Sequence, residues 1–163
     1  MTGEQVKRPP IPDPPYTGSC LCGAVRYSVG ARPLTVTACH CDACKKMSGG
    51  TNLLVFTAPR ASFQHLKGEV LRFRRTADSG RQSDVVHCAQ CGTRVWHEPQ
   101  AFPVVTIAAG TLDDPSWVVP ATHIWIEKAS PAALMHDDAV KFTGQPPREA
   151  QIEAFSALYG AHP

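Results

Sequence analysis

Short alternations of apolar and polar residues recur along most of this chain. Residues 24–29 place Val25, Tyr27 and Val29 on one face, as expected of a half-buried strand. Similar short segments follow at residues 34–38, 52–57, 62–65, 70–75, 85–87, 93–97, 103–108 and 121–127. Strands this short and this numerous predict an all-β domain with little helix.

The two ends of the chain have different patterns. Residues 1–15 hold five prolines, which cannot donate to a sheet and favour extended polyproline II. We expect a loose arm laid across the domain, or plain disorder. Near the other end, apolar residues at helical spacing predict a helix over residues 148–159, with Gly160 as its C-cap. The chain therefore divides into a proline-rich arm (1–15), a main domain (16–145) and a short C-terminal helical tail (146–163).

Composition narrows the function classes. The chain has 163 residues, 43% of them hydrophobic and 18% charged, with a net charge of +2. This near-neutral charge does not indicate the strongly basic surface that is typical of nucleic-acid-binding proteins. No apolar run approaches the roughly 20 residues of a membrane span, and no apolar leader stands at the N-terminus. We therefore expect a cytoplasmic protein that acts on a small molecule, with no nucleic-acid or membrane partner.

The seven cysteines are gathered in three short motifs. The motifs are Cys20-x-Cys22, Cys39-x-Cys41-x2-Cys44 and Cys88-x2-Cys91. Disulfides are a weaker interpretation, because the count is odd and residues two apart rarely bridge. Buried inert thiols are a further alternative. Thiolates at this spacing favour zinc, as a closed four-cysteine structural site and a three-cysteine site with one position open for chemistry.

Two details suggest how the motifs are used. Glycine follows Cys22 and Cys91, which pairs Cys20 and Cys22 with Cys88 and Cys91. In an extended segment Cys39 and Cys41 share a face and His40 points away, so His40 is expected to pack or to support the site rather than bind the same metal.

The basic stretch after Cys44 is predicted to form a turn over residues 45–51. Its glycines allow close backbone approach, so free N–H groups could meet an anion. Lys45, Lys46, Gly49 and Gly50 are thus candidates for binding a substrate carboxylate. The alternative is a tight turn with solvated lysines.

The order of these motifs resembles the glutathione-dependent formaldehyde-activating enzyme family, which also includes the centromere protein V type. The motifs are C-x-C-G, C-H-C-x2-C, C-x2-C-G, Gly-Thr-Leu-Asp-Asp-Pro and His-Ile-Trp, over residues 16–145. The resemblance implies a β-tent of antiparallel sheets with two zinc sites. It implies a structural zinc at Cys20, Cys22, Cys88 and Cys91, and a catalytic zinc at Cys39, Cys41 and Cys44. It also implies a carbon–sulfur lyase that joins glutathione to formaldehyde, giving S-hydroxymethylglutathione, or an enzyme for a related small electrophile.

Some residues near these motifs are ambiguous. Asp113 and His123 are candidates for acid–base or supporting roles, or are structural. Residues 128–132 lack the tryptophan that family members often carry there, so an aromatic wall is expected to be missing.

The chemistry of the open site favours a thiol partner. Three thiolates on Zn²⁺ leave a net charge of about −1, so the metal activates water less well than zinc held by neutral histidines. A soft thiol is the better fourth ligand. The alternatives to an enzyme are a non-catalytic zinc-stabilised interaction module and a metal-storing thiol cluster. An open three-thiolate site in a pocket favours the enzyme, whereas a fourth protein ligand favours the module.

Overall fold

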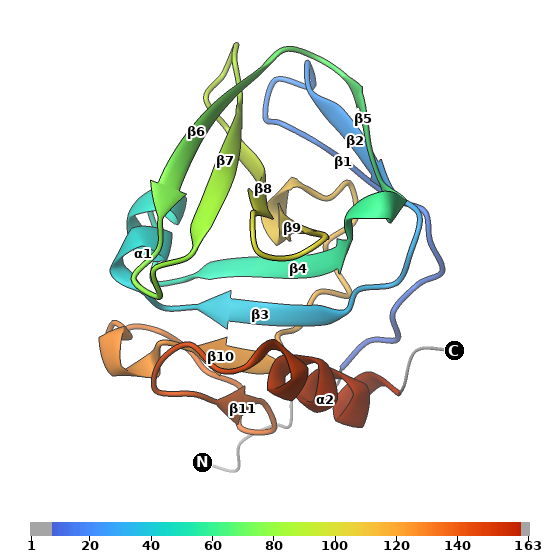
Figure 1. The fold of residues 1–163 in the computed structure, drawn as a ribbon. Coiled ribbons are helices and arrows are strands. Elements are labelled where there is room, and N and C mark those ends of the chain that lie inside the picture. Colours follow the sequence, from blue (N-terminus) through green and yellow to red (C-terminus); the bar gives the residue numbers. More distant parts are fainter. Residues whose placement is uncertain (1–7, 161–163) are drawn as a thin grey trace.

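Two β-sheets enclose the core of the protein, whose computed structural model describes residues 8–160. The small sheet has the order β1-β2-β5, and the large sheet has the order β11-β10-β3-β4-β9-β8-β7-β6. The small sheet consists of β1 (Tyr16–Ser19), β2 (Arg26–Val29) and β5 (Phe63–Lys67). The large sheet consists of β3 (Thr35–Cys39), β4 (Leu53–Pro59), β6 (Val70–Thr76), β7 (Gln82–Cys88), β8 (Arg94–Pro99), β9 (Val104–Ala108), β10 (Thr122–Ile124) and β11 (Val140–Lys141). In Figure 1, β6 and β7 stand opposite β1, β2 and β5 above the floor made by β3 and β4, so the predicted β-tent is confirmed.

Most strand pairs are antiparallel, as predicted, but β10 runs parallel to both of its neighbours, β3 and β11. The strand predicted over residues 121–127 is too long. It ends at Ile124, because Trp125 adopts the left-handed conformation with φ 59°. A 3₁₀ turn, η3 (Ile126–Lys128), follows.

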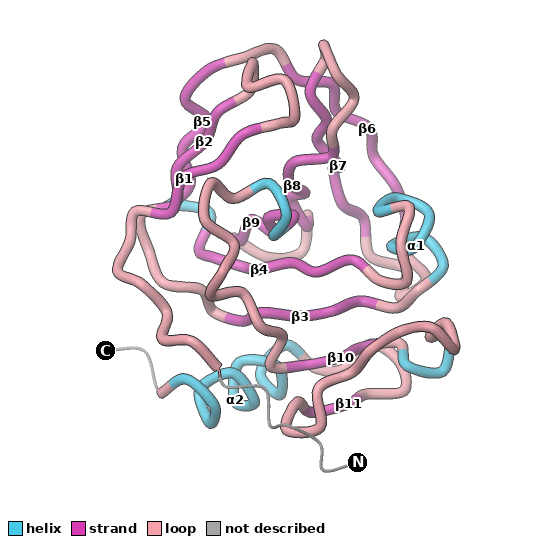
Figure 2. Tube along the Cα trace, turned by 180° about the vertical axis from the view of Figure 1, so that it is seen from behind, coloured by secondary structure: helices cyan, strands magenta, loops and turns pink. Residues whose placement is uncertain are grey.

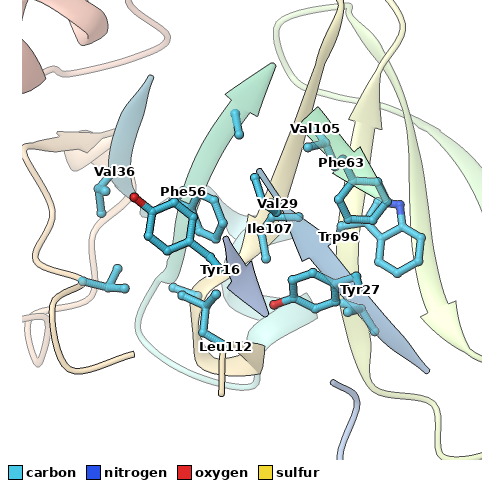
Figure 3. Packing of buried hydrophobic residues seen from close by; sticks show 14 of the residues in the cluster. Tyr16, Tyr27, Val29, Val36, Phe56, Phe63, Trp96, Val105, Ile107 and Leu112 are labelled. Atoms are coloured by element: carbon cyan, nitrogen blue, oxygen red, sulfur yellow. The ribbon is translucent and has the colours of Figure 1, made fainter. Parts of the chain in front are cut away.

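Aromatic side chains fill the space between the sheets (Figure 3). Phe63 of the small sheet packs on Trp96 of the large sheet with ring centroids 4.9 Å apart. Tyr27 stacks on Phe63 at 5.9 Å. Because Tyr27 and Trp96 are fully buried, this contact removes large apolar surfaces from water and holds the two sheets together.

Two helices flank the large sheet. The predicted C-terminal helix is confirmed as α2 (Arg148–Tyr159), which packs on β3 and β10 with Phe155 buried (Figure 2). The turn predicted over residues 45–51 is wrong, because residues 42–48 form α1 (Asp42–Ser48). Gly49, with φ 66°, is its C-cap. Two further 3₁₀ turns are η1 (Arg60–Ser62) and η2 (Ala109–Thr111).

The described part of the proline-rich arm contacts the domain. The Arg8 guanidinium pairs with Asp138 at 2.6 Å and donates to the Pro120 carbonyl at 3.0 Å. Residues 1–7 of the predicted arm lie outside the described residues, as do residues 161–163 of the tail. Within residues 8–160, no helix is both long and apolar enough to cross a membrane.

Candidate metal centre

The first cysteine cluster joins two hairpin turns of the same design. Cys20 and Cys22 lie between β1 and β2, whereas Cys88 and Cys91 lie at the turn between β7 and β8. In each turn the N–H of the first cysteine donates to the carbonyl five residues later, at 3.2 Å for Cys20 and 2.9 Å for Cys88. Each turn also has a glycine with φ 73° directly after its second cysteine. The predicted Cys-Gly pairing of the two motifs is therefore confirmed, and the cluster ties the small sheet to the large one.

The spacing of these four sulfurs fits a metal ion. The Cys22 Sγ atom lies 3.5 Å from Cys20 Sγ and 3.8 Å from Cys88 Sγ, and all four ligand atoms lie within 4.8 Å of one another. Tetrahedral zinc with Zn–S bonds of about 2.3 Å separates its sulfurs by about 3.8 Å. All seven cysteines are free thiols, so the disulfide alternative is not supported.

The second cluster consists of Cys39, Cys41 and Cys44, whose sulfurs also lie within 4.8 Å of one another. Cys39 ends β3 and Cys41 is the N-cap of α1, where its Sγ accepts the Cys44 N–H at 3.4 Å. The strand-to-helix turn therefore brings together thiols that are close in sequence. Among the described residues, this cluster has no fourth histidine, cysteine or carboxylate ligand.

The three thiols compete for protons. Hydrogen bonds from Cys39 and then Cys44 lower the pKa of Cys41 to about 2, whereas the bond with Cys41 raises the pKa of Cys39. The Cys41 thiolate is thus stabilised, whereas ionisation of Cys39 is disfavoured. A bound divalent cation would remove this competition by stabilising all three thiolates, so the donor set fits a thiophilic metal such as zinc.

A cavity of about 210 Å³ lies against the three-cysteine cluster and not against the four-cysteine cluster. Its walls come from strands β3, β4 and β6 to β10, from the loop between β6 and β7, and from the first turns of α1 and α2. Among the described residues that line it, Asp78 is the one carboxylate, and this group is paired with Lys128 at 2.7 Å. The volume suits a small molecule.

Four arginines that have no carboxylate partner within residues 8–160 line this cavity. They are Arg75 of β6, Arg81 of the following loop, Arg94 of β8 and Arg148 of α2. Five arginines outside the cavity are paired with carboxylates: Arg8, Arg26, Arg60, Arg72 and Arg74. The unpaired guanidiniums give the cavity a positive potential that favours anionic ligands.

A β-bulge brings Arg94 to the cavity. The register between β7 and β8 shifts at Val86 and His87, so that Val95 has no partner and joins Trp96 in the core. Without the extra residue, Arg94 would share the core face with Trp96. Instead its guanidinium Nη2 lies 2.6 Å from His97 Nδ1, and both side chains line the cavity.

The sequence analysis missed these arginines. They come from four separate segments, and no local spacing links them. One signal in the sequence was available. Val95 and Trp96 are adjacent apolar residues, whereas strict alternation places a polar residue beside each apolar one, and such a break in alternation is typical of a bulge.

The proposed carboxylate binders after Cys44 lie elsewhere. Lys45 donates to the Lys128 carbonyl at 2.6 Å and pairs with Asp42 at 3.0 Å. The Gly49 N–H donates to the Lys45 carbonyl, and the Gly50 N–H donates to Ser48 Oγ at 3.1 Å. Because the helix end uses these amides, they are not the free N–H groups that we expected.

Lys46 does not line the positively charged cavity either. Neither lysine and neither glycine of the stretch lines the cavity. The expected absence of an aromatic wall is also wrong, because Trp125 and Phe102 line the cavity. Trp125 lies shortly before residues 128–132, which contain no tryptophan.

The histidines have distinct environments. His40 is fully buried away from the sulfurs, and its Nε2 lies 3.0 Å from His123 Nδ1. Burial, followed by the charge of His40, lowers the pKa of His123 to about 4. The prediction that His40 packs apart from the thiols is confirmed. Asp113 pairs with Arg26 at 2.8 Å and accepts from Thr17, so its contacts are structural.

This chain is similar to known proteins. The family model described as glutathione-dependent formaldehyde-activating enzyme matches residues 15–128, which include all seven cysteines. A crystal structure of a Rhodobacter sphaeroides protein is similar, with a TM-score of 0.48 and 16% sequence identity. That similarity covers 78% of this chain and 99% of the other chain.

Proposed function

This chain belongs to the glutathione-dependent formaldehyde-activating enzyme family, and we propose that it is a zinc-dependent carbon–sulfur lyase. Its proposed substrates are glutathione, or a similar anionic thiol, and formaldehyde or a related small electrophile. Addition joins the thiol sulfur to the carbonyl carbon and gives an S-hydroxymethyl adduct. The observation that carries the proposal is an incomplete three-cysteine cluster at the wall of a positively charged cavity.

The two clusters are proposed to have different roles. Cys20, Cys22, Cys88 and Cys91 would hold a structural zinc, because four thiolates complete a tetrahedral site and the cluster joins two hairpin turns. Cys39, Cys41 and Cys44 would hold the catalytic zinc. When bound there, zinc would lower the pKa of a substrate thiol and so supply a nucleophilic thiolate.

The chain's own residues would hold the thiol substrate. We propose that Arg75, Arg81 and Arg148 bind its carboxylates, in place of the lysines and glycines after Cys44. Arg81 and Arg148 each lie 5.2 Å from the centroid of the Phe102 ring, which fixes both side chains at the cavity. An arginine and a carboxylate form strong, often bidentate hydrogen bonds, so these groups would select an anionic thiol over a neutral one.

The cavity favours an enzyme over the interaction module. A module needs its metal sites only for stability, and a fourth protein ligand would then complete the second cluster. Among the described residues that ligand is missing, and all three cysteines line the cavity.

Titration calorimetry tests the proposal directly. Zinc-loaded protein is titrated with glutathione and with S-methylglutathione, in buffers of different ionisation enthalpy. We expect glutathione to bind more tightly and to release a proton, because the metal site accepts a thiolate. S-Methylglutathione should bind weakly and release none. Equal binding of the two compounds would contradict a role of the three-cysteine site in holding the thiol.

Formation of the adduct is followed by NMR exchange spectroscopy with glutathione and formaldehyde. The spontaneous rate is subtracted from the rate with protein. We expect catalysis by the wild type and none by Cys41→Ser. Binding of glutathione without catalysis would direct the search to another small electrophile.

A further inference from the structure

Arg94 and His97 form a pair that the proposed thiol site does not use. Arg94 Nη2 lies 2.6 Å from His97 Nδ1 at the cavity wall. The β-bulge at Val95 places both side chains on the same face of β8. Arg94 is 8% exposed, and Nε and Nη1 of its guanidinium have no hydrogen-bond partner among the described residues. The sheet therefore encloses a positive charge beside the thiols.

The contact with Arg94 determines the tautomer of His97. A guanidinium can only donate hydrogen bonds, so Nδ1 of His97 is the acceptor. In the neutral ring the proton then resides on Nε2. Burial, followed by the charges of Arg94 and Arg75, lowers the pKa of His97 to about 3, so the imidazole is uncharged at neutral pH.

The Nε2–H group of His97 is free to meet a ligand. It has no hydrogen-bond partner among the described residues. Unlike Nε and Nη1 of Arg94, it is not among the fully buried polar side-chain atoms that lack a partner. His97 itself is half-buried and lines the same cavity as the three thiols. A neutral N–H donor in such a site suits an oxygen that gains negative charge during a reaction.

We propose that His97 donates a hydrogen bond from Nε2 to the carbonyl oxygen of the electrophile, with Arg94 as the positioning residue. The inference rests on the proposed function. As the thiolate sulfur forms a bond to the carbonyl carbon, the π electrons of the C=O bond move to oxygen. His97 stabilises this oxyanion while remaining neutral. The oxyanion then takes a proton from solvent, which balances the proton released by the thiol.

The role of Arg94 follows from the same contact. Its guanidinium holds His97 Nδ1 as an acceptor and opposes protonation of the ring. Arg94 lines the same cavity as Cys39, Cys41 and Cys44, so the pair lies at the proposed reaction site. Without Arg94, the proton of the His97 ring should therefore be able to reside on either nitrogen, while the imidazole itself stays in place.

The variants His97→Ala, His97→Gln and Arg94→Met test the proposal, with His65→Gln as the control. His65 is an exposed histidine of β5 outside the cavity. We expect His97→Ala to lower kcat about 100-fold, as for loss of one oxyanion donor, with little change in the KM for glutathione. Glutamine should restore part of kcat, because its amide can donate from a similar position. Zinc content is measured for every variant.

Nitrogen-15 NMR of the histidine rings gives a readout independent of turnover. We expect an unprotonated Nδ1 and a protonated Nε2 for His97 in the wild type, and a mixture of tautomers in Arg94→Met. A protonated Nδ1 in the wild type would overturn the proposal. So would an unchanged kcat in folded, zinc-loaded His97→Ala.

Formate separates this inference from the proposed function. It is a one-carbon oxygen anion that can be titrated even if the wild type does not act on formaldehyde. We expect formate to shift the His97 Nε2 resonance and its Kd to rise at least about tenfold in His97→Ala, with a smaller rise in His97→Gln. Equal Kd values for wild type and His97→Ala would refute the donor role whatever the substrate of the enzyme.

Discussion

Substituting one cysteine in each cluster should separate the structural site from the reaction site. Cys88 is 1% exposed and belongs to the main core, in a cluster that joins the two sheets. Structural zinc contributes about 10–16 kcal/mol in small zinc domains, comparable with the whole net stability of about 5–15 kcal/mol of a protein. Losing even about 5 kcal/mol would lower Tm by about 10–20 °C in a chain of this size. We therefore expect Cys88→Ser to be insoluble or to melt at least 10 °C lower.

Cys41→Ser should have a much smaller effect on folding. The Cys41 side chain is the N-cap of α1, and serine is among the best residues at that position, so the helix keeps its cap. Cys41 lies in a separate, smaller apolar cluster beside the cavity. We expect a Tm within about 4 °C of the wild type, corresponding to about 1 kcal/mol, together with loss of activity.

Thermal unfolding followed by circular dichroism, with zinc measured by mass spectrometry, provides the comparison. Where Cys88→Ser is insoluble, the wild type is titrated with a chelator instead. The first zinc should then leave without unfolding and the second with it. Equal loss of Tm in the two variants, or release of both metals in one unfolding step, would refute the division of roles.

Three further measurements follow from the structure. Arg148→Met should raise the Kd for glutathione about tenfold in calorimetry, because one charged hydrogen bond is lost, whereas Lys46→Ala should leave it unchanged. The folded pKa of His123, about 4, lies below its unfolded value, so the unfolded chain binds more protons and stability is lost as the pH falls from about 6.5 toward 4. His123→Asn should flatten Tm against pH over that range. Gly18→Ala should lower the free energy of unfolding by about 1–3 kcal/mol in urea titration, since its Cβ would overlap a buried hydroxyl and a backbone carbonyl, whereas Gly110→Ala has open space and should have little effect.

The sequence by itself determined the features that depend on local spacing. Alternation predicted most of the strands, and helical spacing predicted α2. The motif from Cys39 to Cys44 also brings its own sulfurs together, because its ligands are two and three residues apart. The Cys-Gly repeat identified Cys20 and Cys88 as parts of matching turns, although 68 residues separate them.

One local signal was present but was misinterpreted. The lysines and Gly49 after Cys44 are also typical of the last turn and C-cap of a helix. Interpreting the glycines as a longer turn placed the carboxylate site at α1. There the helix end itself uses the amides, and Lys45 is bound to the η3 segment.

Tertiary structure alone decided the charge and the reactive groups of the cavity. Arg75, Arg94 and Arg148 are brought together by strand order and by the packing of α2, neither of which any short motif specifies. A single bulged residue, Val95, decides whether Arg94 faces the core or the cavity. Because one residue of register reverses the face of every side chain on a strand, the contact between Arg94 and His97 depends on how β7 and β8 pair.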